Sequence, residues 1–245
     1  MMSLLQKRKL RGHCTAAKIS SQPQAPSGFD IALRIAGILL AAGRGARFHG
    51  DKLRVRLPHA SYGAPAGTPL GVAAAMHLVA ALPESIAVVR EAATALSAAL
   101  AAAGLRIIEC ANADDGMGAS LACGVAAVAD ADGCVVALAD MPWISPATIR
   151  AVATALSEGA PIVAPVYGGQ RGHPVGFSRR HFAALSTLHG DEGARSLLAH
   201  GNAITLIDCD DEGITRDVDT QDDLDDRVSA RELERSRSAD RNRLK

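Results

Sequence analysis

Aromatic side chains are scarce in this chain of 245 residues, since Phe, Trp and Tyr together make up only 3% of it. Such a chain offers few rings on which the bases of single-stranded nucleic acids could stack. An excess of either charge is also missing, because 26 basic and 26 acidic side chains give a formal net charge of zero. Sequence-independent binding of polyanions depends on a basic excess. We therefore expect no nucleic acid partner.

Paired cysteines and long apolar runs are missing as well. The five cysteines are scattered without a C-x-x-C motif, and the eight histidines include no H-E-x-x-H zinc motif. An odd, scattered set of cysteines is typical of reduced thiols and predicts a cytoplasmic protein. The apolar run Ile35–Ala42 is far shorter than the roughly 18 residues that cross a membrane, so we expect no membrane association.

The two ends of the chain differ in composition from its middle. Residues 1–29 carry five basic side chains and no acid, and no apolar stretch of signal-peptide length follows them. We interpret residues 1–30 as a disordered basic extension, part of which could result from a start codon assigned too far upstream. Residues 227–245 are rich in Arg, Glu and Ser and are interpreted as a charged tail. The chemistry is expected in one domain over residues 31–226.

Within this domain, short apolar runs alternate with helical patterns rich in Ala and Leu. The runs expected to form strands are 35–40, 85–89, 105–108, 133–138, 161–164 and 203–207. The expected helices are 69–81, 92–103, 117–128 and one that Ser145 caps and Pro146 begins. Strands separated by helices of about a dozen residues predict βαβ units. We therefore expect a three-layer α/β fold with a mostly parallel sheet, whose ligands bind at the carboxyl ends of the strands.

The first expected strand leads into a glycine-rich loop, Leu40-Ala-Ala-Gly-Arg-Gly-Ala-Arg-Phe-His-Gly-Asp-Lys52. The loop fails the dinucleotide fingerprint, because Phe48 stands at its third glycine position. It also fails the P-loop pattern, because Asp51 precedes the lysine and no Ser or Thr follows. What remains is a loop of small residues followed by cationic ones.

This loop is a candidate phosphate site. Gly43 and Gly45 permit positive φ angles and a close approach of the backbone to a phosphate. Arg47 and Lys52 could neutralise a triphosphate, the arginine as a planar fork and the lysine as a point charge. A simple turn after the strand is the alternative.

Two aspartates are candidate ligands of a divalent cation. Asp140 follows the expected strand 133–138, so its carboxylate would point into the ligand crevice, although a turn before Pro142 would also explain it. Asp219 lies in the acidic segment D-V-D-T-Q-D-D, where capping of a helix that begins near residue 221 is the alternative. Carboxylate oxygens are preferred by hard cations such as Mg²⁺. Asp217 is the weaker candidate of this segment.

A further segment, Asn112–Leu121, contains G-M-G-A-S-L at the expected start of a helix. Gly116 and Gly118 are predicted to leave backbone N–H groups free there, which would make an anion site. Ser120 could cap the helix or donate to a ligand. An ordinary helix start is the alternative.

Six segments together resemble the nucleotidyltransferases of molybdenum-cofactor maturation, and among them most closely the cytidylyltransferases. The segments follow the family's order between Ile35 and Leu224: the glycine-rich loop, G-M-G-A-S-L, L-A-D-M-P, G-Q-R-G-H-P-V-G-F, G-D-E-G-A-R-S-L-L and D-V-D-T-Q-D-D. The resemblance implies a Rossmann-like nucleotidyltransferase fold. It also implies the transfer of CMP from CTP to molybdopterin, with release of pyrophosphate.

The resemblance assigns a role to each matched residue. Arg47, Lys52 and Asp140 would be catalytic, and Asp140 and Asp219 would hold Mg²⁺. His173 and Arg195 would contact the molybdopterin, although a buried structural histidine and an arginine paired with an acid are the alternatives. The nucleotide would lie against Leu40, Ala41, Ala42, Gly43, Gly45, Arg47, Lys52, Gly116, Gly118 and Ser120.

The choice of nucleotide depends on one residue, because L-A-A-G with Ala42 resembles the cytidylyl branch whereas the guanylyl branch tends to L-A-G-G. Three alternatives stay open: a guanylyltransferase, a nucleotidyltransferase for another small substrate, and a non-catalytic carrier of the molybdenum cofactor. A molybdenum hydroxylase would be the recipient of the product.

Overall fold

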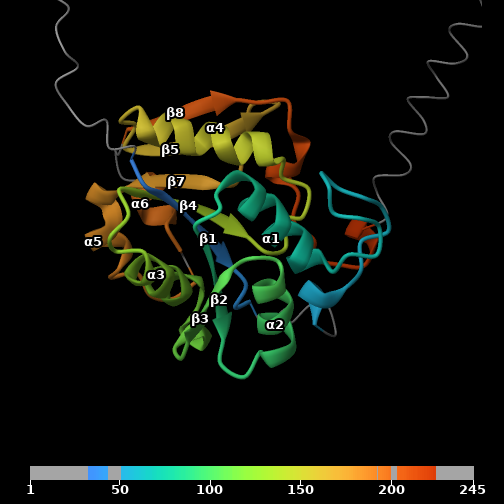
Figure 1. Cartoon of the computed structure of the whole chain (residues 1–245). Coiled ribbons are helices and arrows are strands. Elements are labelled where there is room, and N and C mark those ends of the chain that lie inside the picture. Colours follow the sequence, from blue (N-terminus) through green and yellow to red (C-terminus); the bar gives the residue numbers. More distant parts are fainter. Residues whose placement is uncertain (1–32, 44–50, 192, 200–202, 225–245) are drawn as a thin grey trace, which may run out of the picture. The chain divides into compact units, whose positions relative to one another are not determined.

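The computed structural model describes residues 33–43, 51–191, 193–199 and 203–224 (Figure 1). The expected basic extension and charged tail lie outside these residues, as do Gly45 and Arg47. Among the described residues, the four cysteines at 110, 123, 134 and 209 are free thiols. No helix in the same part of the chain is long and apolar enough to cross a membrane.

The six expected strands are β1–β5 and β8 and the four expected helices are α1–α4, with ends that differ by a few residues, whereas β6, β7, α5 and α6 were not expected. The strands are β1 Ile35–Leu40, β2 Ser85–Arg90, β3 Arg106–Cys110, β4 Gly133–Leu138, β5 Ile162–Tyr167, β6 Gln170–Arg171, β7 Val175–Ser178 and β8 Ile204–Asp208. The helices are α1 Leu70–Ala81, α2 Thr94–Ala102, α3 Met117–Ala127, α4 Pro146–Ser157, α5 Phe182–Leu185 and α6 Arg195–Ala199. Short 3₁₀ turns are η2 Lys52–Arg54, η3 Ala113–Asp115, η4 Arg179–His181 and η5 Glu212–Thr215.

The strands of the described residues form one mixed sheet in the order β3-β2-β1-β4-β7-β5-β6, with β8 parallel to β5. The four strands β3, β2, β1 and β4 are parallel, which confirms the largely parallel sheet. Strand β7 was not predicted and runs antiparallel between β4 and β5. The hairpin from β5 to β6 turns at Gly168 and Gly169, whose φ angles of 56° and 81° suit a two-residue turn.

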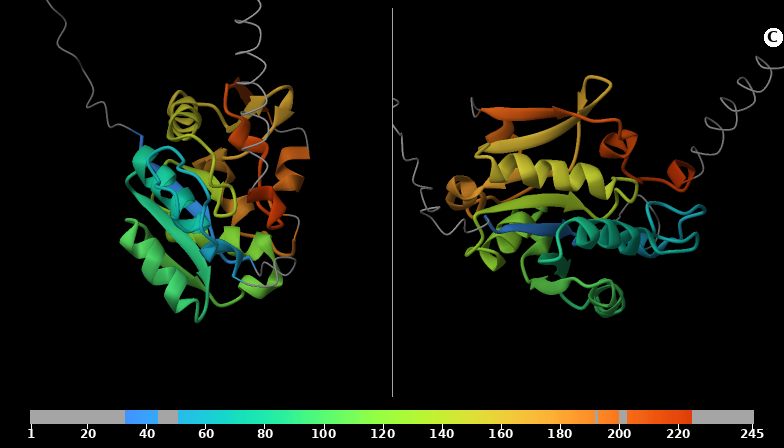
Figure 2. Two further views of the ribbon diagram at one scale, coloured as in Figure 1. Left: turned by 90° about the vertical axis from the view of Figure 1, so that its right-hand side faces the viewer. Right: turned by 45° about the horizontal axis from the view of Figure 1, so that its top comes forward.

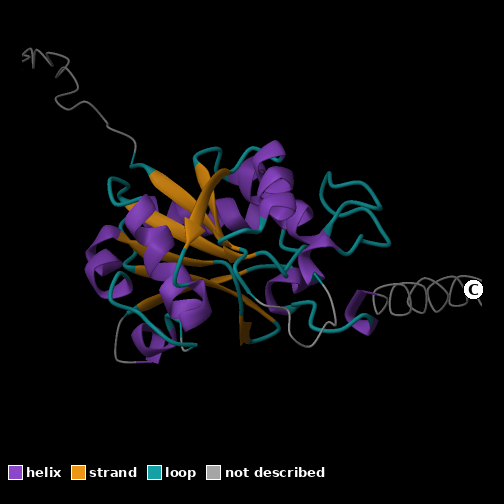
Figure 3. Cartoon of the chain, turned by 90° about the horizontal axis from the view of Figure 1, so that it is seen from below, coloured by secondary structure: helices purple, strands orange, loops and turns teal. Residues whose placement is uncertain are grey.

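Helices cover both faces of the sheet, as the three-layer prediction requires (Figure 3). Along β1 the side chains alternate between the faces, so Leu39 joins a core with α1, α2 and α4, while Ile38 joins a core with α3 and α5. Figure 2 shows α4 lying along the sheet. The sheet is therefore buried on both faces, and its parallel strands can be apolar throughout.

Helix α4 begins as predicted. The Ser145 hydroxyl accepts a hydrogen bond of 3.1 Å from the backbone N–H of Ala147, and Pro146 occupies the first helical position. The buried carboxylate of Asp211 accepts two further bonds here, from Ser145 N at 2.8 Å and from Thr148 Oγ1 at 2.6 Å. These bonds fix the end of the loop that follows β4.

Candidate functional site

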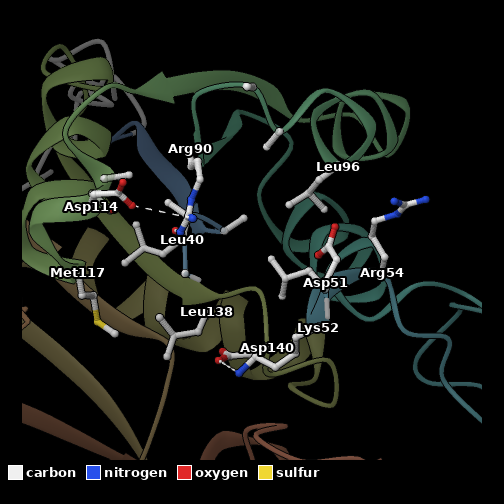
Figure 4. Close-up of a pocket in the computed structure, with 18 of the residues that line it drawn as sticks. Leu40, Asp51, Lys52, Arg54, Arg90, Leu96, Asp114, Met117, Leu138 and Asp140 are labelled. Atoms are coloured by element: carbon white, nitrogen blue, oxygen red, sulfur yellow. Dashed lines mark hydrogen bonds and ion pairs between the residues drawn. The ribbon is translucent and has the colours of Figure 1, made fainter. Parts of the chain in front are cut away.

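A cavity of about 820 Å³ lies at the carboxyl ends of β1, β2 and β4 (Figure 4). This is the edge of the sheet where the sequence predicted a ligand site. Its walls come from the ends of these strands, the turn η2, the start of α2 and the start of α3. The lining residues include Leu40–Gly43, Asp51–Arg54, Arg90, Ala92–Leu96, Ala113, Asp114, Gly116, Met117, Ser120, Leu138, Asp140 and Asp191.

The described part of the glycine-rich loop opens this cavity. Leu40 ends β1, Ala41 and Ala42 are buried in the cores below, and Gly43 is exposed. Because the alanine side chains pack inward, what this stretch offers a ligand is mostly its backbone. Lys52, on the far side of the loop, lies in η2 and lines the same cavity.

Lys52 joins the two predicted metal ligands. Its Nζ lies 2.9 Å from Asp140 Oδ2 and 3.2 Å from Asp219 Oδ1, although the three residues are far apart in the sequence. The lysine side chain is only 12% exposed, against 27% for Asp140 and 45% for Asp219. Burial opposes the charge on the ammonium, but the two carboxylates outweigh it and leave the pKa of Lys52 raised.

A backbone contact brings Asp219 to this place. The N–H of Val218 donates to the carbonyl of Asp140 at 3.0 Å, and the Val218 side chain is fully buried. Asp219 follows and reaches Lys52, whereas Asp217 is exposed and makes none of the contacts with Lys52. The weaker rank of Asp217 therefore agrees with its position.

Capping and site formation occur together in this segment. The carboxylate of Asp223 accepts hydrogen bonds from the backbone N–H groups of Asp219 and Thr220, at 2.8 Å and 2.6 Å. These bonds lower the pKa of Asp223. The sequence predicted a cap near residue 221 from the side chain of Thr220 or Asp219, whereas the bonds observed run to the side chain of Asp223, and they hold Asp219 without using its carboxylate.

The start of α3 differs from the prediction. The N–H of Gly118 is not free, because it donates to the carbonyl of Gly190 at 2.8 Å. Gly116 has a φ of 113°, and a Cβ built on it would lie 2.4 Å from the carbonyl carbon of Gly190. The two glycines therefore allow a close approach of another backbone, and the expected pair of free N–H groups is wrong. Gly116 and Ser120 nevertheless line the cavity.

The far end of the cavity contains residues that sequence reasoning missed. Arg90, the last residue of β2, donates from Nη2 to the carbonyl of Ala42 at 2.8 Å. Its Nη1 lies 3.9 Å from Asp114 Oδ1. Met117 is 46% exposed beside them. The rule that selected Asp140 could have found Arg90, because both follow a predicted strand at its carboxyl end.

The two residues expected to meet a second substrate are His173 and Arg195, and His173 lies within electrostatic range of Asp140. His173 is half-buried, and its Nδ1, which is buried, has no hydrogen-bond partner among the described residues. Burial lowers the pKa of His173, nearby Arg171 and Arg195 lower it further, and Asp140 opposes them. Arg195 is exposed at the first position of α6. The structure thus brings His173 and Arg195 into electrostatic range of each other.

Asp140 and Asp219 suit a divalent cation. The Lys52 ammonium contacts both carboxylates, so the two acidic side chains converge on one positive charge. The described residues contain no cluster of three or more His, Cys, Asp and Glu side chains. A cation held here would therefore take two ligands from the protein and the others from phosphate or water, as is usual for Mg²⁺.

Comparison with known proteins identifies the family. Residues 37–204 match the MobA-like NTP transferase domain, so this chain belongs to the MobA-like NTP transferase family. Nucleotidyltransferase is therefore the class of enzyme that the fold and sequence define.

Two individual proteins are similar in sequence. The chain is 32% identical to a nicotine blue oxidoreductase of Paenarthrobacter nicotinovorans over 76% of its own length and 92% of that protein. It is 34% identical to the purine catabolism protein PucB of Bacillus subtilis over 47% of this chain and 58% of that one.

A solved structure is also similar. Rv0371c of Mycobacterium tuberculosis is 32% identical, with a TM-score of 0.64 over 78% of this chain and 95% of that one. The same protein has been crystallised in complex with manganese, and that structure matches with a TM-score of 0.64 at 29% identity over 80% of this chain and 99% of that one.

Proposed function

We propose that this chain transfers CMP from CTP to molybdopterin in a Mg²⁺-dependent reaction that releases pyrophosphate. The observation that carries the proposal is the position of Lys52 between Asp140 and Asp219, at one end of a cavity large enough for a nucleotide. The resemblance of the six sequence segments supplies the identity of the two substrates. A relative crystallised with manganese supports a divalent cation.

The reaction is a substitution at the α-phosphorus of CTP. A terminal phosphate oxygen of molybdopterin forms the new P–O bond, and the bond to the bridging oxygen of pyrophosphate breaks. Because the nucleophile is already an anion, the protein need not supply a strong general base. Its contribution is alignment of the two phosphates and neutralisation of their charge.

The described residues divide this work. Lys52 would exchange one of its carboxylate partners for the triphosphate and neutralise it. The backbone of Leu40–Gly43 would lie along the nucleotide. Asp140 and Asp219 would hold Mg²⁺, which when bound polarises the phosphoryl oxygens and shields the developing charge.

The acceptor would bind on the other side of Asp140. His173 has a buried nitrogen without a partner among the described residues, and such a group is costly unless a ligand satisfies it. Arg195 lies close enough to act on its charge. We propose that these two residues contact the phosphate of molybdopterin, and that a molybdenum hydroxylase receives the product.

The experiment is to measure pyrophosphate release by the full chain with Mg²⁺ and molybdenum-loaded molybdopterin, supplying CTP, GTP, ATP or UTP. Release with CTP alone would support the proposal. Preference for GTP would keep the mechanism and contradict the choice of nucleotide. No release with any nucleotide, from protein that is folded, would favour another acceptor or a carrier. A titration with molybdopterin alone would then separate those two.

A further inference from the structure

Arg90 stands at the end of the cavity opposite the cation and carboxylate cluster. Figure 4 shows it beside Asp114, away from the pair Lys52 and Asp140. Its Nη2 bonds to the carbonyl of Ala42 at 2.8 Å, and its Nη1 lies 3.9 Å from Asp114 Oδ1. The arginine side chain is 35% exposed and lines the cavity.

The order of the strands fixes the order in which residues from their carboxyl ends lie along the cavity. Asp140 follows β4, Leu40 ends β1 and Arg90 ends β2, and these three strands are neighbours in that order. Under the proposed function, on which this inference rests, the triphosphate lies at the β4 end. The nucleotide then crosses the end of β1, and its base reaches the end of β2.

We propose that Arg90 reads the base of the nucleotide through two adjacent N–H groups. Among the described residues, the guanidinium bonds to Ala42 and faces Asp114, and these contacts use only part of its five N–H donors. The bond to Ala42 fixes the plane of the guanidinium before a ligand arrives. A fork held in this way is selective, because it matches only ligands with two neighbouring acceptors.

Base chemistry then gives the substrate class. Cytosine presents O2 and N3 as adjacent acceptors, and guanine presents O6 and N7. Uracil carries a hydrogen on N3, and adenine carries an amino group beside N7, so each would set a donor against the guanidinium. A donor left facing a donor inside a cavity costs binding free energy. Arg90 therefore favours cytosine and guanine nucleotides over uracil and adenine nucleotides.

The backbone after Arg90 supports a binding role for this wall. Ala92 lines the cavity and has a φ of 62°, a left-handed conformation that is uncommon for residues other than glycine. Such conformations persist where surrounding structure imposes them, and they cluster at binding sites. The turn at Ala92 directs the chain from β2 across the cavity to α2.

The test measures nucleotide binding directly, without an acceptor, so that turnover does not enter. The full chain, with Arg90→Met and Arg90→Lys, is titrated calorimetrically with the four nucleoside triphosphates in Mg²⁺. Wild type should bind CTP about tenfold or more tightly than UTP. Both variants should lose most of that ratio, because lysine keeps the charge but not the fork. Thermal denaturation shows whether each variant is folded.

A matched control removes an equivalent arginine outside the cavity. Arg106 also donates from Nη2 to a backbone carbonyl, that of Ala127, at 2.9 Å. Arg106→Met should leave the CTP to UTP ratio unchanged. This control separates the loss of an arginine–carbonyl bond from the loss of base recognition.

Two results would overturn the inference while the proposed function stands. One is equal binding of CTP and UTP by wild type. The other is an equal loss of affinity for both nucleotides in the Arg90 variants, which would mean that Arg90 only holds Ala42 in place. Failure of the folded wild type to bind any nucleotide would overturn the inference and the proposed function together.

Discussion

The parallel strands β3, β2, β1 and β4 and the remaining strands β7, β5, β6 and β8 carry polar side chains in different ways. At the ends of the parallel strands, Arg90 and Asp140 face a cavity. The partner of Asp140 is Lys52, whose side chain is long and flexible. In the other half, Asp211 is 4% exposed and its Oδ1 accepts from Gly213 N at 3.0 Å, in addition to its bonds at α4.

The partners of Asp140 and Asp211 distinguish a carboxylate suited to ligand binding from one that stabilises the fold. Asp211 accepts three hydrogen bonds from the protein itself, so its charge is fully used by the fold. Asp140 is paired with the Lys52 ammonium, whose flexible side chain can move away. Carboxylates with partners that can be exchanged are suited to ligands, and carboxylates bonded to the backbone are suited to stability.

The largest expected effect comes from Asp140→Asn. Turnover should fall about a thousandfold, because the amide removes the charge that would hold the divalent cation beside the reacting phosphate. The melting temperature should stay close to that of wild type, since the side chain is partly exposed. Pyrophosphate release and differential scanning calorimetry check the two parts, and wild-type turnover would contradict the metal assignment.

Asp211→Asn should lower the stability of the protein and leave its turnover unchanged. The free energy of unfolding should fall by about 2–3 kcal/mol, because the amide places an N–H₂ group against donors that the carboxylate accepted from. Turnover per folded molecule should be unchanged. Urea denaturation gives the first quantity, and a large loss of turnover in folded protein would erase the contrast with Asp140.

Lys52→Met tests whether the ammonium and a divalent cation compete for the same two carboxylates. Without the ammonium, two carboxylates face each other, so nucleotide-free protein should bind Mn²⁺ about tenfold more tightly, a change of the size expected for one nearby charge. Arg54→Met, in the same turn η2, is the control for a change in net charge. Paramagnetic resonance of free Mn²⁺ measures both, and equal affinities would show that Lys52 and the metal do not compete.

The smallest expected effect concerns His77, which is buried in α1 and whose Nε2 lies 2.8 Å from the carbonyl of Ser61. Burial lowers its pKa in the folded protein, although the Ser61 carbonyl opposes this. Below about pH 6.5 the unfolded chain takes up a proton that the folded chain resists, so stability falls as the pH falls. His77→Gln should reduce this loss by about 1 kcal/mol or less between pH 7 and pH 5. Denaturation at both pH values measures it, and an unchanged pH dependence would contradict the assignment.

Much of the fold could be predicted because the buried strands are continuous apolar runs, and β1 and β4 have the bounds expected from the sequence. Strand β7 was not predicted because it has only four residues and overlaps the motif G-Q-R-G-H-P-V-G-F, which was interpreted as a substrate-binding segment and not as a strand. The grouping of Lys52, Asp140 and Asp219 was predicted through resemblance, and the structure adds the contacts.

One part of the site could not be obtained from local sequence, and another was overlooked in it. The N–H of Gly118 was expected to be free because a helix start leaves such groups unpaired, but a partner supplied by Gly190 is a property of the tertiary fold. Arg90 was missed because the loop after its strand contains no glycine motif to draw attention to it. Its place directly after the predicted strand 85–89 was enough to select it by the rule that selected Asp140.

The bond between Gly118 and Gly190 also joins two segments that would serve different substrates. The start of α3 is a wall of the cavity, and Gly190 begins the segment that leads to Arg195. With no Cβ between them, the two backbones touch directly, and the hydrogen bond of 2.8 Å joins them. Under the proposed function, a ligand that orders one segment would lower the entropy cost of ordering the other, and the two substrates would be linked through a contact that contains no side chain.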